Sequence, residues 1–191
     1  MKRHVLLLLA CLVALSCGAQ TTQVALRGQG VAEGILQGGI YTYKGIPYAR
    51  AERFMPPEAS ASWVGVRSFT DYGPICPQGM IMGFGQAPQM DDDCQNLNIW
   101  TPAIHDGGKR PVMLWLHGGG FESGSSRGDS SDGANLSRRG DVVIVSINHR
   151  LNILGHLDLS AYGEKYASSG NVGILDIMAA LEWITSTSST T

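Results

Sequence analysis

The hydrophobic pattern of the chain predicts three buried strands, over residues 97–100, 112–116 and 141–148. Each is a short apolar run between proline, glycine or polar residues, which is typical of a strand rather than a helix. The run at 112–116 shows no polar alternation, so we expect that strand to lie in the middle of a sheet. Apolar residues at helical spacing between residues 171 and 184 predict one helix after these strands. Strands followed by a helix indicate an α/β fold with a mixed sheet.

The regions that flank these elements have a more broken pattern. Residues 23–26, 31–36 and 40–44 are short alternating segments separated by glycines, which predicts a small N-terminal antiparallel sheet. Residues 45–49 break that pattern, and recurring prolines and glycines predict a long irregular surface segment from 53 to 90. Residues 185–191 contain only Thr and Ser, so we expect a low-complexity tail that does not extend the helix.

The first residues have the pattern of an export signal. Lys-Arg-His at residues 2–4 precedes an apolar run over 5–15, and small residues follow it. The apolar run is too short to span a bilayer. We therefore expect a signal peptide over residues 1–19 and an exported protein, periplasmic or extracellular.

Cys17 gives this signal a second interpretation. Together with Ala14, Leu15 and Ser16 it resembles a bacterial lipobox, in which residues 1–16 are removed and the cysteine becomes the lipidated first residue. Ordinary cleavage near Ala19 or Gln20 is the alternative, and the sequence leaves both open. The first alternative would anchor the protein to a membrane by lipid.

Composition and charge narrow the range of partners. The chain is 43% hydrophobic and 16% charged, as in an ordinary globular protein. Its formal charge is −2, and it has no cluster of Lys or Arg beyond the first few residues. These features argue against nucleic acid or an anionic membrane surface as a partner and favour a small neutral substrate.

The cysteines and histidines suggest no cofactor. Outside the signal only Cys76 and Cys94 remain, and in an exported protein they form either a disulfide or two buried free thiols. His149 and His156 are seven positions apart, with no carboxylate or cysteine at ligand spacing. The acidic run at 91–93 lacks the glycine and distant glutamate of an EF-hand loop. We expect neither a metal ion nor a cofactor.

The candidate chemistry lies directly after the strand at 112–116, where His117 is followed by Gly118, Gly119 and Gly120. Glycines have no Cβ to shield their amides, so another group can approach the backbone closely. Amides at the end of a strand can form an oxyanion hole, which binds the negative oxygen that develops during acyl transfer. The alternative is that these glycines form only a flexible turn.

Several motifs in fixed order resemble the N-terminal part of the type-B carboxylesterases, a family of the α/β-hydrolase superfamily. They are Lys-Gly-Ile-Pro-Tyr-Ala at 44–49, Arg-Phe-Met-Pro-Pro at 53–57, Asp-Cys at 93–94 with Leu-Asn-Ile-Trp-Thr-Pro at 97–102, His-Gly-Gly-Gly at 117–120, Asn-His-Arg-Leu at 148–151 and Gly-Asn-Val-Gly-Ile-Leu-Asp at 170–176. The chain departs from the family pattern at Gln95 and Asn96, at His149 and at Asn152. The family more often has an apolar and an aromatic residue, a tyrosine and a glycine at these positions.

This resemblance implies both a fold and a site. The fold would be an α/β-hydrolase fold with a mixed, mostly parallel central sheet, of which residues 20–184 form the N-terminal part. Gly119 and Gly120 would supply two oxyanion-hole amides, and Cys76 would pair with Cys94. The activity implied is that of an exported carboxylic-ester hydrolase, which acts on a small neutral ester through a serine acyl-enzyme.

The catalytic residues themselves are not recognisable in the chain. Gly-Ser-Ser-Arg-Gly at 124–128 matches the nucleophile pattern, but no strand precedes Ser126 and a polar loop follows it. In the family the serine, acid and histidine come after the helix at 171–184. We therefore expect an N-terminal fragment, incomplete at its C-terminus, that is inactive alone. The alternatives are a non-catalytic, cholinesterase-like adhesion module and a truncated product that does not fold.

Overall fold

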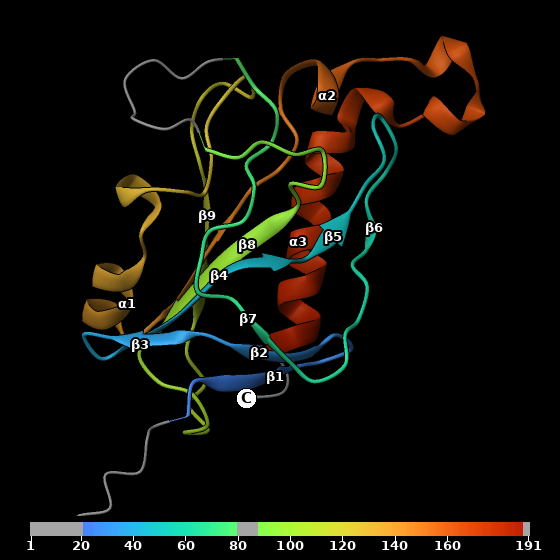
Figure 1. The fold of residues 1–191 in the computed structure, drawn as a ribbon. Helices are drawn as coiled ribbons and strands as arrows, with labels where there is room; N and C mark the ends of the chain where they lie inside the picture. The colour runs from blue at the N-terminus through green and yellow to red at the C-terminus, as the bar shows by residue number, and fades with distance from the viewer. Residues whose placement is uncertain (1–20, 80–87, 189–191) are drawn as a thin grey trace, which may run out of the picture.

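The computed structural model describes residues 21–79 and 88–188 (Figure 1). The expected signal peptide at 1–19, with Cys17, lies outside the described residues, as do residues 189–191 of the expected tail. No helix in the described ranges is both long enough and apolar enough to cross a membrane.

A five-stranded sheet forms the centre of the structure (Figure 1). Its order is β3 (Ile35–Gln37), β4 (Ile40–Pro47), β8 (Asn96–Thr101), β10 (Val143–Ile147) and β9 (Val112–Leu116). The three strands expected from the apolar runs are present as β8, β9 and β10. The sheet is mixed, as expected, but among its own described strands only the β9–β10 pairing is parallel. The expectation of a mostly parallel sheet is therefore wrong for the described residues.

Strand β9 is the outermost of the described strands of this sheet, so the second neighbour that a central position requires is not among the described residues. It pairs with β10 along one side, and no other described strand pairs with its second side. Met113 and Trp115 are 47% and 49% exposed, so apolar side chains of β9 remain in contact with solvent. An apolar run indicates that a strand favours burial, but it does not specify which strands cover it.

The N-terminal segments divide between two sheets instead of forming one antiparallel sheet. Strands β1 (Gln23–Leu26) and β2 (Gly30–Glu33) pair antiparallel, and β7 (Val66–Ser68) adds to β2 in parallel. Gly34 follows β2, and only glycine fits there because a Cβ would lie 2.4 Å from the carbonyl oxygen of Thr42. The chain then enters the main sheet as β3, so β3 and β4 belong to the large sheet.

Strand β4 continues to Pro47, three residues beyond the predicted end. Its register against β8 shifts between Tyr43 and Ile46, which is a β-bulge. Gly45 occupies the bulge with φ 75°, and its amide donates to Asn98 Oδ1 at 3.0 Å. The glycine that interrupts the sequence pattern thus bends the strand and does not end it. The segment from 53 to 90 is irregular where described, apart from β7 and the short β6 (Glu58–Ala59), which pairs with β5 (Ala49–Arg50).

Helices cover both faces of the main sheet. Helix α3 (Val172–Ser188) packs Ile177, Ala180 and Ile184 against the core that includes Tyr43, Leu97 and Val145. Helix α1 (Ala134–Gly140) lies over the other face, where Ile40, Trp100 and Ile144 cluster. The remaining helical elements are α2 (Asn152–His156) and four 3-10 turns, η1 (Asp129–Ser131), η2 (Ser160–Tyr162), η3 (Glu164–Tyr166) and η4 (Ser169–Asn171).

Helix α3 runs past the predicted end at 184 and includes Thr185 to Ser188. The Thr185 hydroxyl donates to the Leu181 carbonyl at 2.8 Å, and the Ser186 hydroxyl donates to that of Trp183 at 2.9 Å. Hydroxyls that bond to the preceding turn are compatible with a helix, which corrects the expectation for these residues. Trp183 also donates from Nε1 to Gln29 Oε1 at 2.9 Å, so the helix is joined to the β1–β2 turn.

Candidate functional site

The glycine loop, residues 117–121, begins directly after β9. Gly119, Gly120 and Phe121 have φ values of 123°, 63° and 61°. The carbonyl of Gly119 accepts hydrogen bonds from the amides of Glu122 and Ser123 at 3.1 and 3.2 Å. A Cβ at position 119 would lie 2.0 Å from the Ser123 carbonyl oxygen. The loop therefore requires glycine at 119 for space, and glycine at 120 suits its positive φ.

The amides of Gly119 and Gly120 have no acceptor among the described residues. Both glycines are exposed. Two exposed N–H groups on adjacent residues can donate to one oxygen that carries negative charge. The sequence prediction about these two residues is thus compatible with the geometry of the loop.

Four aromatic side chains contact one another at the loop. The rings of His117 and His149 are parallel, with centroids 4.9 Å apart. Phe121 places its ring 6.1 Å from His149 and 5.3 Å, edge to face, from His156. Burial lowers the pKa of His117, and burial together with the neighbouring His117 lowers that of His149. Both histidines therefore favour the neutral form.

Hydrogen bonds orient the two stacked histidines. The Nδ1 of His117 is 2.9 Å from the Gly118 carbonyl, and that of His149 is 3.2 Å from the Arg150 carbonyl. A carbonyl only accepts, so each neutral ring carries its proton on Nδ1. Within the described ranges no group of three or more His, Cys, Asp or Glu is arranged to hold a metal ion.

Ser126 lies in a buried loop and is not presented to solvent. It is 1% exposed, and Asn98 Nδ2 lies 3.0 Å from both its hydroxyl and its carbonyl oxygen. Its amide donates to Asn148 Oδ1 at 2.8 Å. A nucleophile elbow projects its serine from a sharp turn between a strand and a helix, and neither element borders Ser126. These contacts give Ser126 a structural role.

An open depression of about 1030 Å³ lies beside the glycine loop. Gly120 and Phe121 form one side of it, and Pro77, Ile153 and Leu157 contribute apolar surface on the other sides. The opening is large enough for a small organic molecule. The site therefore combines two available amides with an apolar surface next to them.

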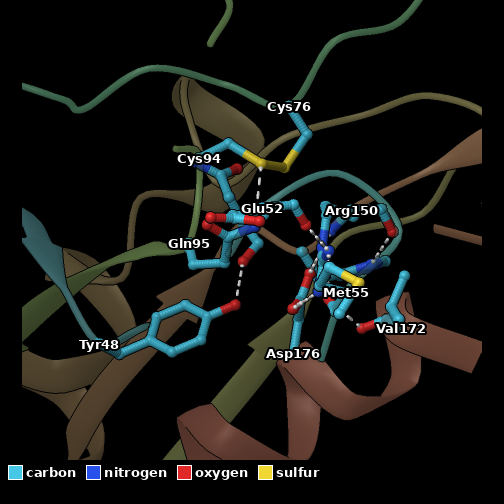
Figure 2. A network of polar contacts seen from close by, with 11 residues as sticks. Tyr48, Glu52, Met55, Cys76, Cys94, Gln95, Arg150, Val172 and Asp176 are labelled. Carbon is cyan, nitrogen blue, oxygen red and sulfur yellow. Dashed lines mark hydrogen bonds and ion pairs between the residues drawn. A yellow bond between two sulfur atoms is a disulfide. The ribbon is translucent and has the colours of Figure 1, made fainter. Parts of the chain in front are cut away.

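A buried ion pair holds the chain that leaves β10 against α3 (Figure 2). Arg150 Nη2 lies 2.7 Å from Asp176 Oδ1, and both Arg150 Nε and its backbone amide donate to Oδ2 at 2.9 Å. Arg150 also donates to the carbonyls of Glu52 and Met55. Figure 2 shows the Cys76–Cys94 disulfide in the same region, as the resemblance implies.

The sheet with helices on both faces and the strand that ends in a glycine loop define an α/β protein. Residues 18–188 match the model of the Carboxylesterase family. The chain belongs to this family, as the N-terminal portion of a type-B carboxylesterase domain.

Similar proteins agree with this assignment. Para-nitrobenzyl esterase of Bacillus subtilis is 36% identical over 171 residues, covering 86% of this chain and 34% of the relative. Phenmedipham hydrolase of Pseudarthrobacter oxydans is 38% identical over 174 residues, with the same coverage. Neuroligin-2 of Mus musculus is 35% identical over 191 residues, covering 77% of this chain and 22% of the relative.

Two solved structures have the same arrangement. An esterase from Clostridium hathewayi that can hydrolyse aliphatic aromatic polyesters has a TM-score of 0.81 at 44% identity, covering 86% of this chain and 34% of that one. The carboxylesterase of Geobacillus stearothermophilus at pH 6.2 has a TM-score of 0.79 at 43% identity, with 87% and 34% covered. The chain thus spans about a third of the length of these two structures and of the two hydrolases named above.

Proposed function

We propose that this chain supplies the oxyanion-hole part of a carboxylic-ester hydrolase. The amides of Gly119 and Gly120 would donate to the ester oxygen as it gains negative charge during attack by a serine. The observation that carries this proposal is that both amides lack an acceptor among the described residues in a loop of glycine-dependent shape. Two fixed donors act most strongly on the charge that forms in the transition state.

The nucleophile, acid and base belong, in this proposal, to the part of the family domain that follows the matched third. Family order supports this placement, because the serine comes after the helix that corresponds to α3. The buried contacts of Ser126 support it too, since they leave its hydroxyl unavailable. The substrate class is a small neutral ester, whose uncharged part would lie in the apolar depression next to Phe121.

Hydrolysis of a p-nitrophenyl ester by the purified chain tests the first part of this proposal. We expect no rate above buffer, because the described residues offer no activated serine. Hydrolysis well above buffer, with sensitivity to a serine-directed organophosphate, would contradict the assignment of the nucleophile to a later part of the domain.

A chimaera tests the role of the glycines. Residues 23–184 of this chain would replace the matching segment of para-nitrobenzyl esterase of Bacillus subtilis. The Cβ of Gly119→Ala would lie 2.0 Å from the Ser123 carbonyl oxygen and so displace the amide from the oxyanion. We expect kcat to fall by roughly 10²- to 10³-fold, as when an oxyanion-hole donor is lost. Gly118→Ala is the matched control, because a Cβ at position 118 meets nothing within 4 Å and φ there is not positive. Equal kcat for both variants would refute the assigned role of the loop.

The proposal also includes export of the protein from the cytoplasm. Residues 1–19 would direct the chain out of the cytoplasm, with either cleavage near Ala19 or lipidation of Cys17. Labelling with a radioactive fatty acid distinguishes these two forms. Label that is present in the natural chain and lost in Cys17→Ser supports a lipid anchor, and an unlabelled mature protein supports ordinary cleavage.

A further inference from the structure

Gln78 binds the backbone of Gly124 at two points. The Gly124 amide donates to Gln78 Oε1 at 2.7 Å, and Gln78 Nε2 donates to the Gly124 carbonyl at 2.8 Å. The same Nε2 donates to the Cys76 carbonyl at 3.0 Å. A primary amide has a donor and an acceptor side by side, so it can engage both polar groups of one residue as a neighbouring strand would. These bonds fix Gly124 to the disulfide segment, residues 76–78.

Gly124 in turn packs against the beginning of the glycine loop. A Cβ at position 124 would lie 2.3 Å from the Gly118 carbonyl oxygen and 2.4 Å from His117 Nδ1. Such a close approach is possible only for glycine. Any movement of Gly124 away from Gln78 would therefore remove the support behind Gly118 and His117.

Asn152 joins the same disulfide segment to the other end of the glycine loop. The backbone N–H of Asn152 donates to the Phe121 carbonyl at 2.6 Å, and its side-chain Nδ2 donates to the Pro77 carbonyl at 2.9 Å. Its Oδ1 accepts from the Leu154 amide at 3.2 Å. Its φ is 51°, a conformation that asparagine tolerates better than most residues. The side chain thus adds a link that glycine at this position cannot make.

The disulfide connects these contacts to the central sheet. Cys76 and Cys94 are 2% and 0% exposed, and Cys94 lies two residues before β8. The segment that holds Gly124 and Asn152 is therefore covalently tied to the chain that enters β8. A loop supported by this segment has little freedom to move its amides.

We propose that Gln78 and Asn152 are positioning residues that hold the Gly119 and Gly120 amides ready for an oxyanion. The proposal rests on the proposed function of the loop. Amides without an internal acceptor gain by turning toward water or toward other backbone groups, so their orientation has to be imposed from outside the loop. Donors that are already aligned need no reorganisation when charge develops. Gln78 and Asn152 impose this alignment from its two ends.

Backbone order parameters from ¹⁵N relaxation test this proposal in the purified chain, labelled with ¹⁵N-glycine. We expect Gly119 and Gly120 to be as ordered as rigid backbone, with S² about 0.85, and to fall below about 0.6 in Gln78→Ala and in Asn152→Gly. Asn152→Gly keeps the positive φ accessible and removes the two side-chain hydrogen bonds, to Pro77 and from Leu154. It therefore remains informative even if Gln78→Ala fails to fold.

Two further variants separate positioning from general stability. Gln29→Ala is the control, because the Gln29 side-chain amide also joins distant segments but bonds to Pro47 and Trp183 instead. It should lower the free energy of unfolding and leave the order of Gly119 and Gly120 unchanged. Asn152→Asp keeps an acceptor for Leu154 and loses the donor to Pro77, so it should behave as Asn152→Gly does.

Three results would overturn the proposal. The order parameters of Gly119 and Gly120 could stay unchanged in Gln78→Ala and Asn152→Gly, or they could stay unchanged in Asn152→Asp. They could also fall as far in Gln29→Ala as in the other variants. None of these results depends on ester hydrolysis. If the order parameters contradict the positioning role, the kinetics of the chimaera still test the oxyanion-hole assignment. If the chimaera contradicts that assignment, the order parameters still show whether Gln78 and Asn152 hold the loop.

Discussion

Replacing Asp176 with asparagine should destabilise the fold more than any surface change of similar size. Asp176 is 0% exposed and Arg150 is 3% exposed, and the carboxylate accepts three hydrogen bonds from Arg150. Asparagine has almost the same shape but no charge, so the guanidinium would stay buried without its counterion. Breaking a buried pair from one side costs about 3–5 kcal/mol. This loss is a large part of the roughly 5–15 kcal/mol that stabilises a typical domain.

Urea denaturation followed by circular dichroism measures this change directly. We expect the free energy of unfolding to fall by about 3–5 kcal/mol at an unchanged m value. The corresponding decrease in Tm is about 2–4 °C for each kcal/mol in a chain of this size. Glu58→Gln is the control, because it removes a charge from the Arg50–Glu58 pair, whose side chains are 65% and 72% exposed. An exposed pair of this kind contributes about 0–1 kcal/mol.

A loss of less than about 1 kcal/mol in Asp176→Asn would refute this reasoning, because it would mean that water still reaches Arg150. The double variant Arg150→Met with Asp176→Leu makes the test stricter. Since apolar residues often replace a buried pair without loss, the double variant should recover part of the stability that Asp176→Asn removes. Recovery is partial because the carbonyls of Glu52 and Met55 lose their donor.

Three further predictions concern pH, the disulfide and the buried serine. Because burial lowers the pKa of His117 and of His149 below 6.5, the unfolded chain binds protons at higher pH than the folded one. The free energy of unfolding should therefore fall as the pH drops through about 6.5, and His149→Phe should flatten this dependence; a profile that is flat between pH 7.5 and 5 would contradict it. Replacing Cys76 and Cys94 together with serine should cost about 3 kcal/mol in urea denaturation, and a loss under about 1 kcal/mol would mean that the link constrains little. In the chimaera, Ser126→Ala should leave organophosphate labelling intact while lowering Tm, and loss of labelling would make Ser126 a nucleophile.

The local sequence pattern predicted where the strands and helices lie better than it predicted which strands pair with one another. The apolar runs located β8, β9 and β10, because burial of a strand depends on its own side chains. The position of β9 in the sheet depends on which strands pair with it, and no local pattern carries that information. Gly34 and Gly45 show the same limit. Gly34 lies inside the predicted segment 31–36, yet the chain passes there from β2 into another sheet, and Gly45 interrupts the pattern but forms a bulge inside a strand.

The part of the candidate site that consists of backbone amides on consecutive residues could be predicted from the sequence. Three glycines after a strand indicated the loop at 118–120 from sequence alone. The support from Gln78 was not predictable, because it depends on a contact with Gly124, 46 residues away. Asn152 gave one signal, as a departure from the glycine common in the family, but its meaning required the contact with Pro77.

The hydrogen bond between Gln29 and Trp183 has a consequence for the order in which the chain folds. Its partners are 154 residues apart, and Tyr48 and Asn148, which are also bonded, are 100 apart. Contacts between such distant residues form slowly, because a long stretch of chain has to be ordered first. Synthesis begins at the N-terminus, so the β1–β2 hairpin leaves the ribosome long before helix α3 exists. We expect this hairpin to dock late, and the nascent chain to depend on chaperones until it does.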